Sequence, residues 1–533
     1  MFKKINSLSI VISFFIFLLS LYNTKADKYL SDWNITVNLS TFNDEITGLA
    51  VDSNNNIIVS GFGRTSFTDG YWNISKFNST GYYLWSYKFD GNYGDDQASV
   101  VAVDNQDNFV VAGYERVSPA SSPSNYSWRI MKFDSSTIPT QIWNITYNIT
   151  LNSDKPLDLA IDNDNNITVV GYYNPKSGDY GWHIVKFGND STYLWNRSFN
   201  FSSGIDQAYG VATDNDNNIT VVGLDRLPDG NNEWRIMKFD KYGNSFWNRT
   251  VNFSTNGDQA YDVAIDHDNN IIVVGFDKSR GSSNDQWRIM KLDKENNIIW
   301  NTSYDLSPAG DTARAVTIDR NSNNITVVGY NYSTDYGWYV MRIGANDNAT
   351  LWTYYDNPSP SSDQTRSVVV DHNNDIIIGG YVTLLNPNNY AWRIMKFKSV
   401  RCGNGRIEST DEECDYMASN PHAPCQPFER CDNTCQCVDF RPNMFGCRYF
   451  DYCENGLAPN DPTTLCSSNW DYYCHTEDPS LVTLIQGLCE DSTWVNHSWM
   501  TCPNGIASCG THGEGNGICE TGESHTSCPA DCP

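Results

Sequence analysis

The stretch from Asp258 to Asn301, DQAYDVAIDHDNNIIVVGFDKSRGSSNDQWRIMKLDKENNIIWN, sets the pattern for most of this chain. It holds four short apolar segments separated by polar turns rich in Asp, Asn, Gly and Ser, which is typical of β-strands joined by tight turns. None of the four segments has a helical hydrophobic period of useful length. We therefore predict that this stretch forms a unit of four antiparallel strands.

The same unit is repeated seven times along the chain, at intervals of 52, 58, 52, 52, 53 and 52 residues. The aspartates that open the copies are Asp44, Asp96, Asp154, Asp206, Asp258, Asp311 and Asp363. In every copy a second aspartate follows eight residues later, a glycine lies in the second strand, and a tryptophan opens the third strand with a base four residues after it. Self-similarity at this period, with four strands in each unit, predicts the blades of a β-propeller.

The N-terminal segment is predicted to close the ring of blades. The fourth strand of six copies carries a tryptophan, namely Trp85, Trp143, Trp195, Trp247, Trp300 and Trp352. The seventh copy stops at Val400 before it reaches such a strand, whereas WNITVNL from Trp33 has the same pattern as WNRSFNF and WNRTVNF. We therefore expect an all-β fold with a seven-bladed propeller over residues 33–400, whose last blade is completed by the N-terminal strand.

Residues 1–26 are predicted to be a secretory signal peptide. MFKK is the basic start, SIVISFFIFLLSL is the apolar run, and Thr24-Lys25-Ala26 provides a small-residue cleavage site. A membrane anchor is the alternative, but the run is short for a helix that spans a bilayer, which needs about 20 apolar residues. No later stretch could span a membrane, so we expect a secreted protein, extracellular or associated with the cell surface.

The composition changes after Val400, because every cysteine of the chain lies in residues 402–533. The 16 cysteines are Cys402, Cys414, Cys425, Cys431, Cys435, Cys437, Cys447, Cys453, Cys466, Cys474, Cys489, Cys502, Cys509, Cys519, Cys528 and Cys532. An even number of cysteines behind a signal peptide predicts disulfides in a loop-rich region with a small core. Zinc is the alternative for the close set from Cys425 to Cys437, but no paired Cys-x-x-Cys or histidine supports it.

The net charge of −27 restricts the class of partner. Such a protein repels nucleic acid and anionic membrane surfaces. The charge can simply keep the protein soluble outside the cell. It also allows a cationic partner, or a partner bridged by a divalent ion such as calcium.

Asparagine-x-Ser/Thr sequences are frequent and predict a glycoprotein. Several stand just after the fourth-strand tryptophan, and the main candidates are Asn34, Asn144, Asn196, Asn248 and Asn301. The fourth strand is the outermost strand of a blade, so glycans there would cover a free sheet edge. Similar sequences at Asn166, Asn218 and Asn324 end the hairpin turn, and we expect those to serve the turn instead.

Two parts of the chain resemble known repeat families. DVAIDHDNNIIVVG and SVVAVDNQDNFVVAG resemble the secreted β-propeller repeats of bacteria and archaea and look like NHL and SBBP repeats. CGNGRIESTDEECD, CDNTCQC and GNGICETGESHTSCPADC resemble the cysteine-rich repeats of myxobacterial and archaeal surface proteins. These resemblances imply a binding or scaffold module at the cell surface and imply little about chemistry.

The acidic turns are the candidate sites. The seven opening aspartates are expected to ring one mouth of the central channel, where they could hold a partner, cap the local turn, or pair with the third-strand base. Asp162, Asp164 and Asn166 alternate like calcium ligands, but the loop lacks the glycine and the closing glutamate of a twelve-residue calcium site. A hairpin turn is therefore the favoured interpretation, and calcium is the alternative.

No catalytic motif is present, since the chain lacks Gly-x-Ser-x-Gly, His-Glu-x-x-His and a phosphate loop. The repeated carboxylates also share one environment, whereas a glycosidase needs two carboxylates in different environments. We therefore predict a non-enzymatic binding or adhesion scaffold without a cofactor, which holds a protein or glycan on a propeller face. The alternatives are a structural component of a surface coat and a carbohydrate-active enzyme with a site built from loops.

Overall fold

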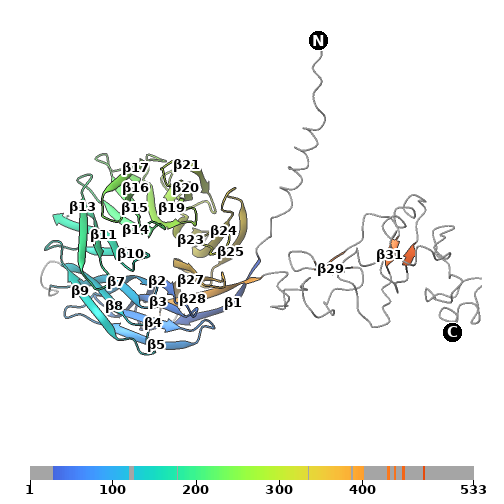
Figure 1. The fold of residues 1–533 in the computed structure, drawn as a ribbon, viewed down its shortest axis with the longest axis horizontal. Helices are drawn as coiled ribbons and strands as arrows, with labels where there is room; N and C mark the ends of the chain where they lie inside the picture. Colours follow the sequence, from blue (N-terminus) through green and yellow to red (C-terminus); the bar gives the residue numbers. More distant parts are fainter. Residues whose placement is uncertain are drawn as a thin grey trace, which may run out of the picture. The chain divides into compact units, whose positions relative to one another are not determined.

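The computed structural model describes residues 28–118, 125–176, 178–333, 335–385 and 388–400, together with four short strands between residues 429 and 474 (Figure 1). The predicted signal peptide over residues 1–26 lies outside the described residues, as does most of the predicted disulfide-stapled region over 402–533. The propeller unit extends from Tyr29 to Ser399.

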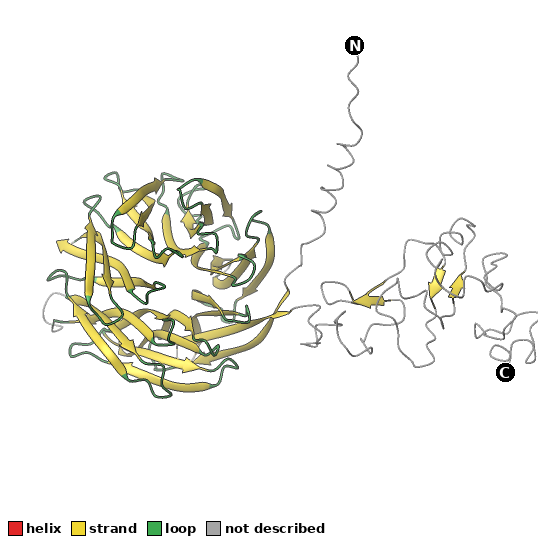
Figure 2. Cartoon of the chain, in the orientation of Figure 1, coloured by secondary structure: helices red, strands yellow, loops and turns green. Residues whose placement is uncertain are grey.

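Seven four-stranded antiparallel sheets form the propeller, and no other secondary structure than strands occurs in its described residues (Figure 2). The innermost strands are β2 (Glu45–Val51), β6 (Gln97–Val103), β10 (Lys155–Ile161), β14 (Gln207–Thr213), β18 (Gln259–Ile265), β22 (Thr312–Ile318) and β26 (Gln364–Val370). The second strands are β3 (Ile57–Ser66), β7 (Phe109–Arg116), β11 (Ile167–Lys176), β15 (Ile219–Arg226), β19 (Ile271–Asp277), β23 (Ile325–Tyr332) and β27 (Ile376–Leu385).

The outer half of each blade is equally regular. The third strands are β4 (Asp69–Phe77), β8 (Tyr126–Phe133), β12 (Asp179–Phe187), β16 (Asn232–Phe239), β20 (Gln286–Leu292), β24 (Tyr336–Ile343) and β28 (Asn388–Val400). The outermost strands are β5 (Tyr83–Phe89), β9 (Gln141–Tyr147), β13 (Tyr193–Phe199), β17 (Ser245–Val251), β21 (Ile298–Tyr304), β25 (Thr350–Asp356) and β1 (Lys28–Val37). These four sets confirm the predicted all-β fold of seven blades.

The N-terminal strand closes the ring as predicted. The strand order of the seventh blade is β1-β28-β27-β26, so the two ends of the propeller segment meet in one sheet. Trp33 and Ile35 of β1 pack against the core between the seventh and first blades. Trp33 Nε1 also donates a hydrogen bond to the Ser79 carbonyl of the first blade, at 3.3 Å. The closing strand therefore binds both neighbours of the closure point.

Neighbouring blades are joined by the repeated tryptophan and glycine. Trp234 of β16 is fully buried, and its Nε1 donates a hydrogen bond to the Phe276 carbonyl of the next blade at 3.1 Å. A Cβ atom at the adjacent Gly275 would lie only 2.9 Å from Trp234 Cζ2, so only glycine leaves room for the indole. The same indole bond joins Trp72 to Tyr114, Trp182 to Leu224, Trp287 to Tyr330, Trp338 to Tyr381 and Trp392 to Phe62. The last bond crosses from the seventh blade to the first.

Two small antiparallel pairs are the described part of the cysteine-rich region. They are β29 (Glu429–Cys431) with β30 (Cys437–Asp439), and β31 (Cys447–Tyr449) with β32 (Tyr472–Cys474). Within the described residues, no helix is long and apolar enough to cross a membrane.

Candidate functional site

The opening aspartates are buried parts of the connections between blades. Asp258 shows the arrangement, since its Oδ2 accepts hydrogen bonds from the backbone N–H groups of Phe253 (2.7 Å) and Ser254 (2.8 Å). Its Oδ1 accepts bonds from the Ser254 hydroxyl (2.7 Å) and from the backbone N–H of Lys278 (3.2 Å). Both oxygens are thus used by the local chain.

All seven opening aspartates share this burial, since each is 0 % exposed. Burial raises the pKa of all seven carboxyl groups, to about 6 for Asp96 and for Asp206. A partner cannot touch these oxygens while the connections keep their folded conformation. The geometry therefore favours turn capping over ligand binding for the ring that the sequence predicts.

The second aspartate of each copy pairs with the base on the third strand. The ion pairs are Asp52–Lys76 (2.8 Å), Asp104–Lys132 (2.6 Å), Asp162–Lys186 (2.7 Å), Asp214–Lys238 (3.0 Å), Asp266–Lys291 (2.8 Å), Asp319–Arg342 and Asp371–Lys396 (2.8 Å). The expectation that opening aspartates pair with these bases is wrong, because the base lies beside the hairpin turn at the other end of the strand. Burial would raise the pKa of Asp266, but hydrogen bonds from Lys291 and Asn270 hold it below its ordinary value.

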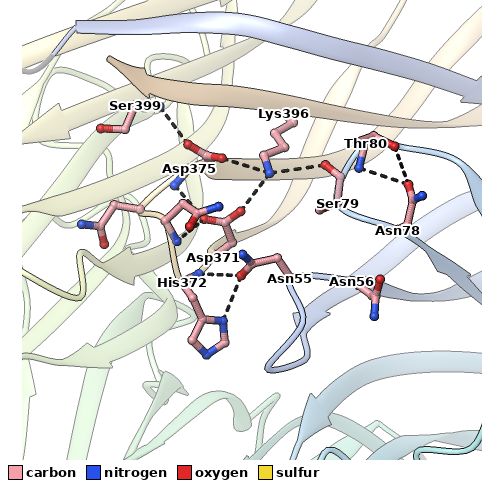
Figure 3. A network of polar contacts seen from close by, with 12 residues as sticks. Asn55, Asn56, Asn78, Ser79, Thr80, Asp371, His372, Asp375, Lys396 and Ser399 are labelled. Atoms are coloured by element: carbon pink, nitrogen blue, oxygen red, sulfur yellow. Dashed lines mark hydrogen bonds and ion pairs between the residues drawn. The ribbon is translucent and has the colours of Figure 1, made fainter. Parts of the chain in front are cut away.

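The hairpin turns between the first and second strands are bonded to one another around the whole ring. Figure 3 shows one junction, where the backbone N–H of His372 donates to Asn55 Oδ1 of the first blade at 2.9 Å. Asn55 has a φ of 61°, a left-handed conformation that asparagine tolerates better than most residues. The same bond joins Ser53 to Asp107, Asn105 to Asn165, Asn163 to Asn217, Asn215 to Asn269, His267 to Asn323 and Arg320 to Asn374.

The turn that resembles a calcium loop uses its oxygens within the protein. Asp162 Oδ1 accepts bonds from the backbone N–H groups of Asp164 (3.0 Å) and Asn166 (2.8 Å). Asp162 Oδ2 accepts a bond from Asn166 Nδ2 (3.1 Å) and pairs with Lys186. This geometry is that of a capped hairpin turn. Among the described residues there is no group of three His, Cys, Asp or Glu side chains placed to hold a metal ion.

The innermost strands contain a feature in which the seven copies differ. In β18 the partner of Ala260 is Gly275 and the partner of Asp262 is Val274, so Tyr261 is an extra residue. The same register shift occurs in all seven innermost strands. The residues at this bulge position are Thr47, Ser99, Leu157, Tyr209, Tyr261, Arg314 and Arg366. Four consecutive blades thus carry large side chains with a hydroxyl or a guanidinium group.

We call Tyr209, Tyr261, Arg314 and Arg366 the channel arc. The rings of Tyr209 and Tyr261 meet edge to face with centroids 5.3 Å apart, and the Arg314 guanidinium lies 4.1 Å from the centroid of Tyr261. Arg366 forms an ion pair with Glu45 at 3.3 Å. The charge of Arg314 also acts on the hydroxyl groups of tyrosines from four blades. Side chains from blades that are not neighbours approach one another only at the propeller axis, so the arc lies in the channel.

Arg314 has no acidic partner among the described residues. Burial would lower the pKa of Arg314, but the hydroxyl groups of Tyr261, Tyr330, Tyr209 and Tyr381 raise it, and the guanidinium lies over the ring of Tyr261. Burial raises the pKa of Tyr261, and the guanidinium of Arg314 opposes that rise. In another part of the propeller Lys155 lies 3.7 Å from the ring centroid of Tyr114 and 4.4 Å from that of Tyr126, and burial lowers the pKa of this lysine to about 8. The channel arc itself thus combines aromatic rings with two bases, of which only Arg366 has a carboxylate partner in the described part of the chain.

Two innermost strands carry a carboxylate at the residue that follows the bulge position, namely Asp158 and Asp262. Asp158 Oδ2 accepts a hydrogen bond from the backbone N–H of Val211 in the next blade, and Asp262 Oδ2 accepts one from Val316, both at 2.8 Å. Burial raises the pKa of Asp262 to about 7. It also raises the pKa of Asp158, and the charge of Asp262 adds to that rise. Their blades are not neighbours, so this interaction crosses the channel.

The glycosylation candidates lie where the sequence places them. Asn34, Asn144, Asn248 and Asn301 are exposed on the outermost strands. Asn196 is half-buried, and its Nδ2 donates to the Tyr147 hydroxyl at 2.9 Å. The asparagines of the hairpin turns use their amides within the turn, because Nδ2 of Asn166 and of Asn218 each donates a hydrogen bond to the aspartate of its own turn. Glycosylation of the outer strands stays a prediction, and it has a geometric basis.

The channel arc and the pair Asp158 and Asp262 do not stand out by motif in the sequence. Their signal is a departure from repetition: the third residue after the opening aspartate is small in two copies and is tyrosine or arginine in four others. A column-by-column comparison of the repeats would have shown it. The sequence cannot show that these residues face one channel, because the bulge that turns them inward depends on pairing with the second strand.

Comparisons with known proteins agree with the fold and go no further. No family model matches the chain. A segment is 28 % identical over 156 residues to an uncharacterised WD repeat-containing protein of Acanthamoeba polyphaga mimivirus, covering 22 % of this chain and 11 % of that protein. The chain therefore spans about a tenth of the length of this relative.

Solved structures that resemble the chain are distant propellers. The WD40 domain of Toxoplasma gondii coronin has a TM-score of 0.43 at 10 % identity and covers 72 % of this chain and 87 % of its own. The β-propeller domain of the Trilobed protease from Pyrococcus furiosus has a TM-score of 0.40 at 10 % identity, with coverages of 67 % and 97 %. The seven-bladed propeller fold therefore rests on the strand order of this chain itself.

Proposed function

We propose that this protein is a secreted or cell-surface binding propeller that holds a protein or glycan partner at one mouth of its channel. The mouth is the one at which the innermost strands begin. The observation that carries the proposal is the channel arc, because the bulge position that faces the channel carries unlike residues in the seven blades. Repetition is expected where residues only build blades, and unlike residues converging in a concavity are typical of a recognition site.

The variable loops support the choice of this mouth. The backbone N–H of Asp258 donates to the Asn232 carbonyl at the start of β16, at 2.9 Å. The connection that enters an innermost strand therefore lies beside the loop that enters a third strand. Those loops differ in sequence from blade to blade, as in DRLPDGNNE and VTLLNPNNY. Recognition by loops on a rigid scaffold is the common arrangement in propellers and similar folds.

A polysaccharide-active enzyme is the second candidate, on the strength of Asp158 and Asp262. Two carboxylates with raised pKa values across one channel are the kind of groups that general acid–base catalysis uses. Both oxygens of each carboxylate accept hydrogen bonds from backbone N–H groups, one of them in the next blade. The same contacts are equally consistent with a structural role in holding neighbouring blades together. Product formation from a panel of polysaccharides, lost in Asp262→Asn, would favour the enzyme.

Binding to arrays of glycans and surface proteins tests the proposal on the full secreted chain. We expect a captured partner, and we expect the double variant Tyr209→Ala, Tyr261→Ala to lose it. His267→Ala is the matched control, because His267 is an exposed turn residue at the opposite mouth whose bond to Asn323 comes from its backbone. Equal binding by the double variant, or loss in the control alone, would refute a site at this mouth.

A further inference from the structure

The most unusual group in the channel is the guanidinium of Arg314. It is partly buried among tyrosines of four blades and forms no ion pair with any described residue. Buried or half-buried arginines normally meet a carboxylate, because an uncompensated charge is costly to remove from water. The neighbouring Arg366 follows this rule through Glu45. Arg314 is therefore a cation held in place without its own counter-charge.

The groups around Arg314 are suited to a sugar ring. Tyr209 and Tyr261 offer aromatic surface, and ring faces of this kind pack against the C–H faces of sugars. Gln207 and Gln259 lie at the start of the two innermost strands, and the Tyr209 hydroxyl donates a hydrogen bond to Gln207 Oε1. Such amides can donate and accept at once, as sugar hydroxyl groups require. An acidic peptide would use the guanidinium but has less need of this aromatic surface.

We infer that the channel mouth binds an acidic saccharide, with its carboxylate or sulfate on Arg314 and its ring against Tyr209 and Tyr261. This inference rests on the proposed function, because it names the ligand of the same mouth. It differs from the cationic partner that the net charge of −27 suggests. A guanidinium forms paired hydrogen bonds with a planar carboxylate or with two sulfate oxygens, so both acids fit the same residue.

Isothermal titration of the full chain with four polysaccharides tests the inference. The probes are polygalacturonate, its carboxyl-reduced neutral form, dextran sulfate and dextran. We expect tight binding of one acidic member and weak binding of its neutral partner, and the acidic member that binds identifies carboxylate or sulfate. Arg314→Gln should weaken this binding roughly tenfold or more, since a hydrogen bond to a charged group is lost. Arg314→Lys should restore part of it.

Arg320→Gln is the matched control, because Arg320 flanks the same strand, β22, but is exposed at the opposite mouth. The melting temperature of each variant shows that the channel stays folded. Equal affinity of Arg314→Gln and the unchanged protein for the acidic probe would overturn the inference and leave the proposed function intact. Equal binding of acidic and neutral members would do the same.

Two further outcomes separate the inference from the proposed function. If poly-glutamate at equal charge concentration displaces the sugar, the ligand of the channel mouth is an acidic peptide and not a saccharide. If none of the four probes binds, the acidic-saccharide assignment falls, and the array of surface proteins decides the proposed function separately.

Discussion

The two mouths of the propeller channel are built from the same seven repeats and differ in what the repeats conserve. At the hairpin mouth, all seven turns carry an aspartate paired with a third-strand base and an Asn or Asp that bonds the next turn. At the other mouth, the bulge position holds threonine, serine, leucine, tyrosine or arginine, depending on the blade. Residues of the same kind in all seven copies mark the bonds that keep the ring together, including the opening aspartates at the second mouth. The bulge position does not repeat, and it is there that we propose recognition.

The largest expected effect concerns ring closure, on which both mouths depend. A secreted chain that starts at Thr41 lacks β1, so β28 has a free edge and the core between the first and last blades loses Trp33 and Ile35. An apolar side chain that leaves the core costs about 1.5–3 kcal/mol, so we expect the loss of these two to cost about 3–6 kcal/mol. Denaturant unfolding and light scattering should show lower stability and aggregation. An unchanged unfolding midpoint would contradict closure by β1.

A buried ion pair at the hairpin mouth should come second. Lys238→Met leaves the carboxylate of Asp214 buried without its cation, which we expect to cost about 3–5 kcal/mol. Lys294→Met is the matched control, because the pair of Lys294 with Glu295 is exposed and should contribute little. Urea unfolding of both variants gives the comparison. Equal stabilities would mean that the repeated pairs do not hold the hairpin mouth.

The bonds between neighbouring turns should have a smaller effect. Asn217 has a φ of 64°, and its Oδ1 accepts from the backbone N–H of Asn163 at 3.0 Å. Asn217→Ala places a strained residue there and removes the bond, at about 2–3 kcal/mol. Asn217→Gly tolerates the conformation and loses only the side-chain bonds, at about 1 kcal/mol. If both variants lose the same amount, the backbone conformation is not what selects asparagine.

The smallest effect should be a pH dependence at the mouth that holds the channel arc. The pKa of Asp262 is about 7 in the folded protein, above its value of about 3.9 in an unfolded chain. Folding therefore favours the protonated form, so this contribution is complete below about pH 4 and is lost as the pH rises to about 7. Asp262 is only half-buried, so we expect Asp262→Asn to remove on the order of 1 kcal/mol of this decline.

Unfolding free energies of both proteins at pH 4, 5.5, 7 and 8 would measure the difference. The opening aspartates also have raised pKa values, but they are unchanged in the variant and cancel. The pKa of Asp158 should fall in the variant, because the charge of Asp262 no longer raises it, so the difference reports on Asp158 and Asp262 together. Identical pH profiles for the two proteins would show that Asp262 titrates in its ordinary range.

The sequence by itself determined the number of blades, the order of strands and the closure by Trp33. These follow from alternation within short segments and from Asp and Asn in tight turns, which act between residues close in the chain. Counting the copies then required no knowledge of contacts. The same reasoning placed the glycosylation candidates on the outer strands, because the fourth strand of a blade has no outer neighbour.

Only the tertiary structure decided what the repeated and unrepeated side chains do. In the folded protein Asp258 is buried in a turn, Lys291 forms an ion pair with Asp266, and Trp234 packs against Gly275 of the next blade. The tertiary structure also turned Arg314 toward tyrosines of other blades. The bonds of Asp258 are mostly local, and the pair of Lys291 with Asp266 joins strands of one blade. The indole contact of Trp234 and the surroundings of Arg314 join different blades, so they form only when the blades close around one axis. A local pattern therefore predicted each strand, while the channel and its site exist only in the assembled ring.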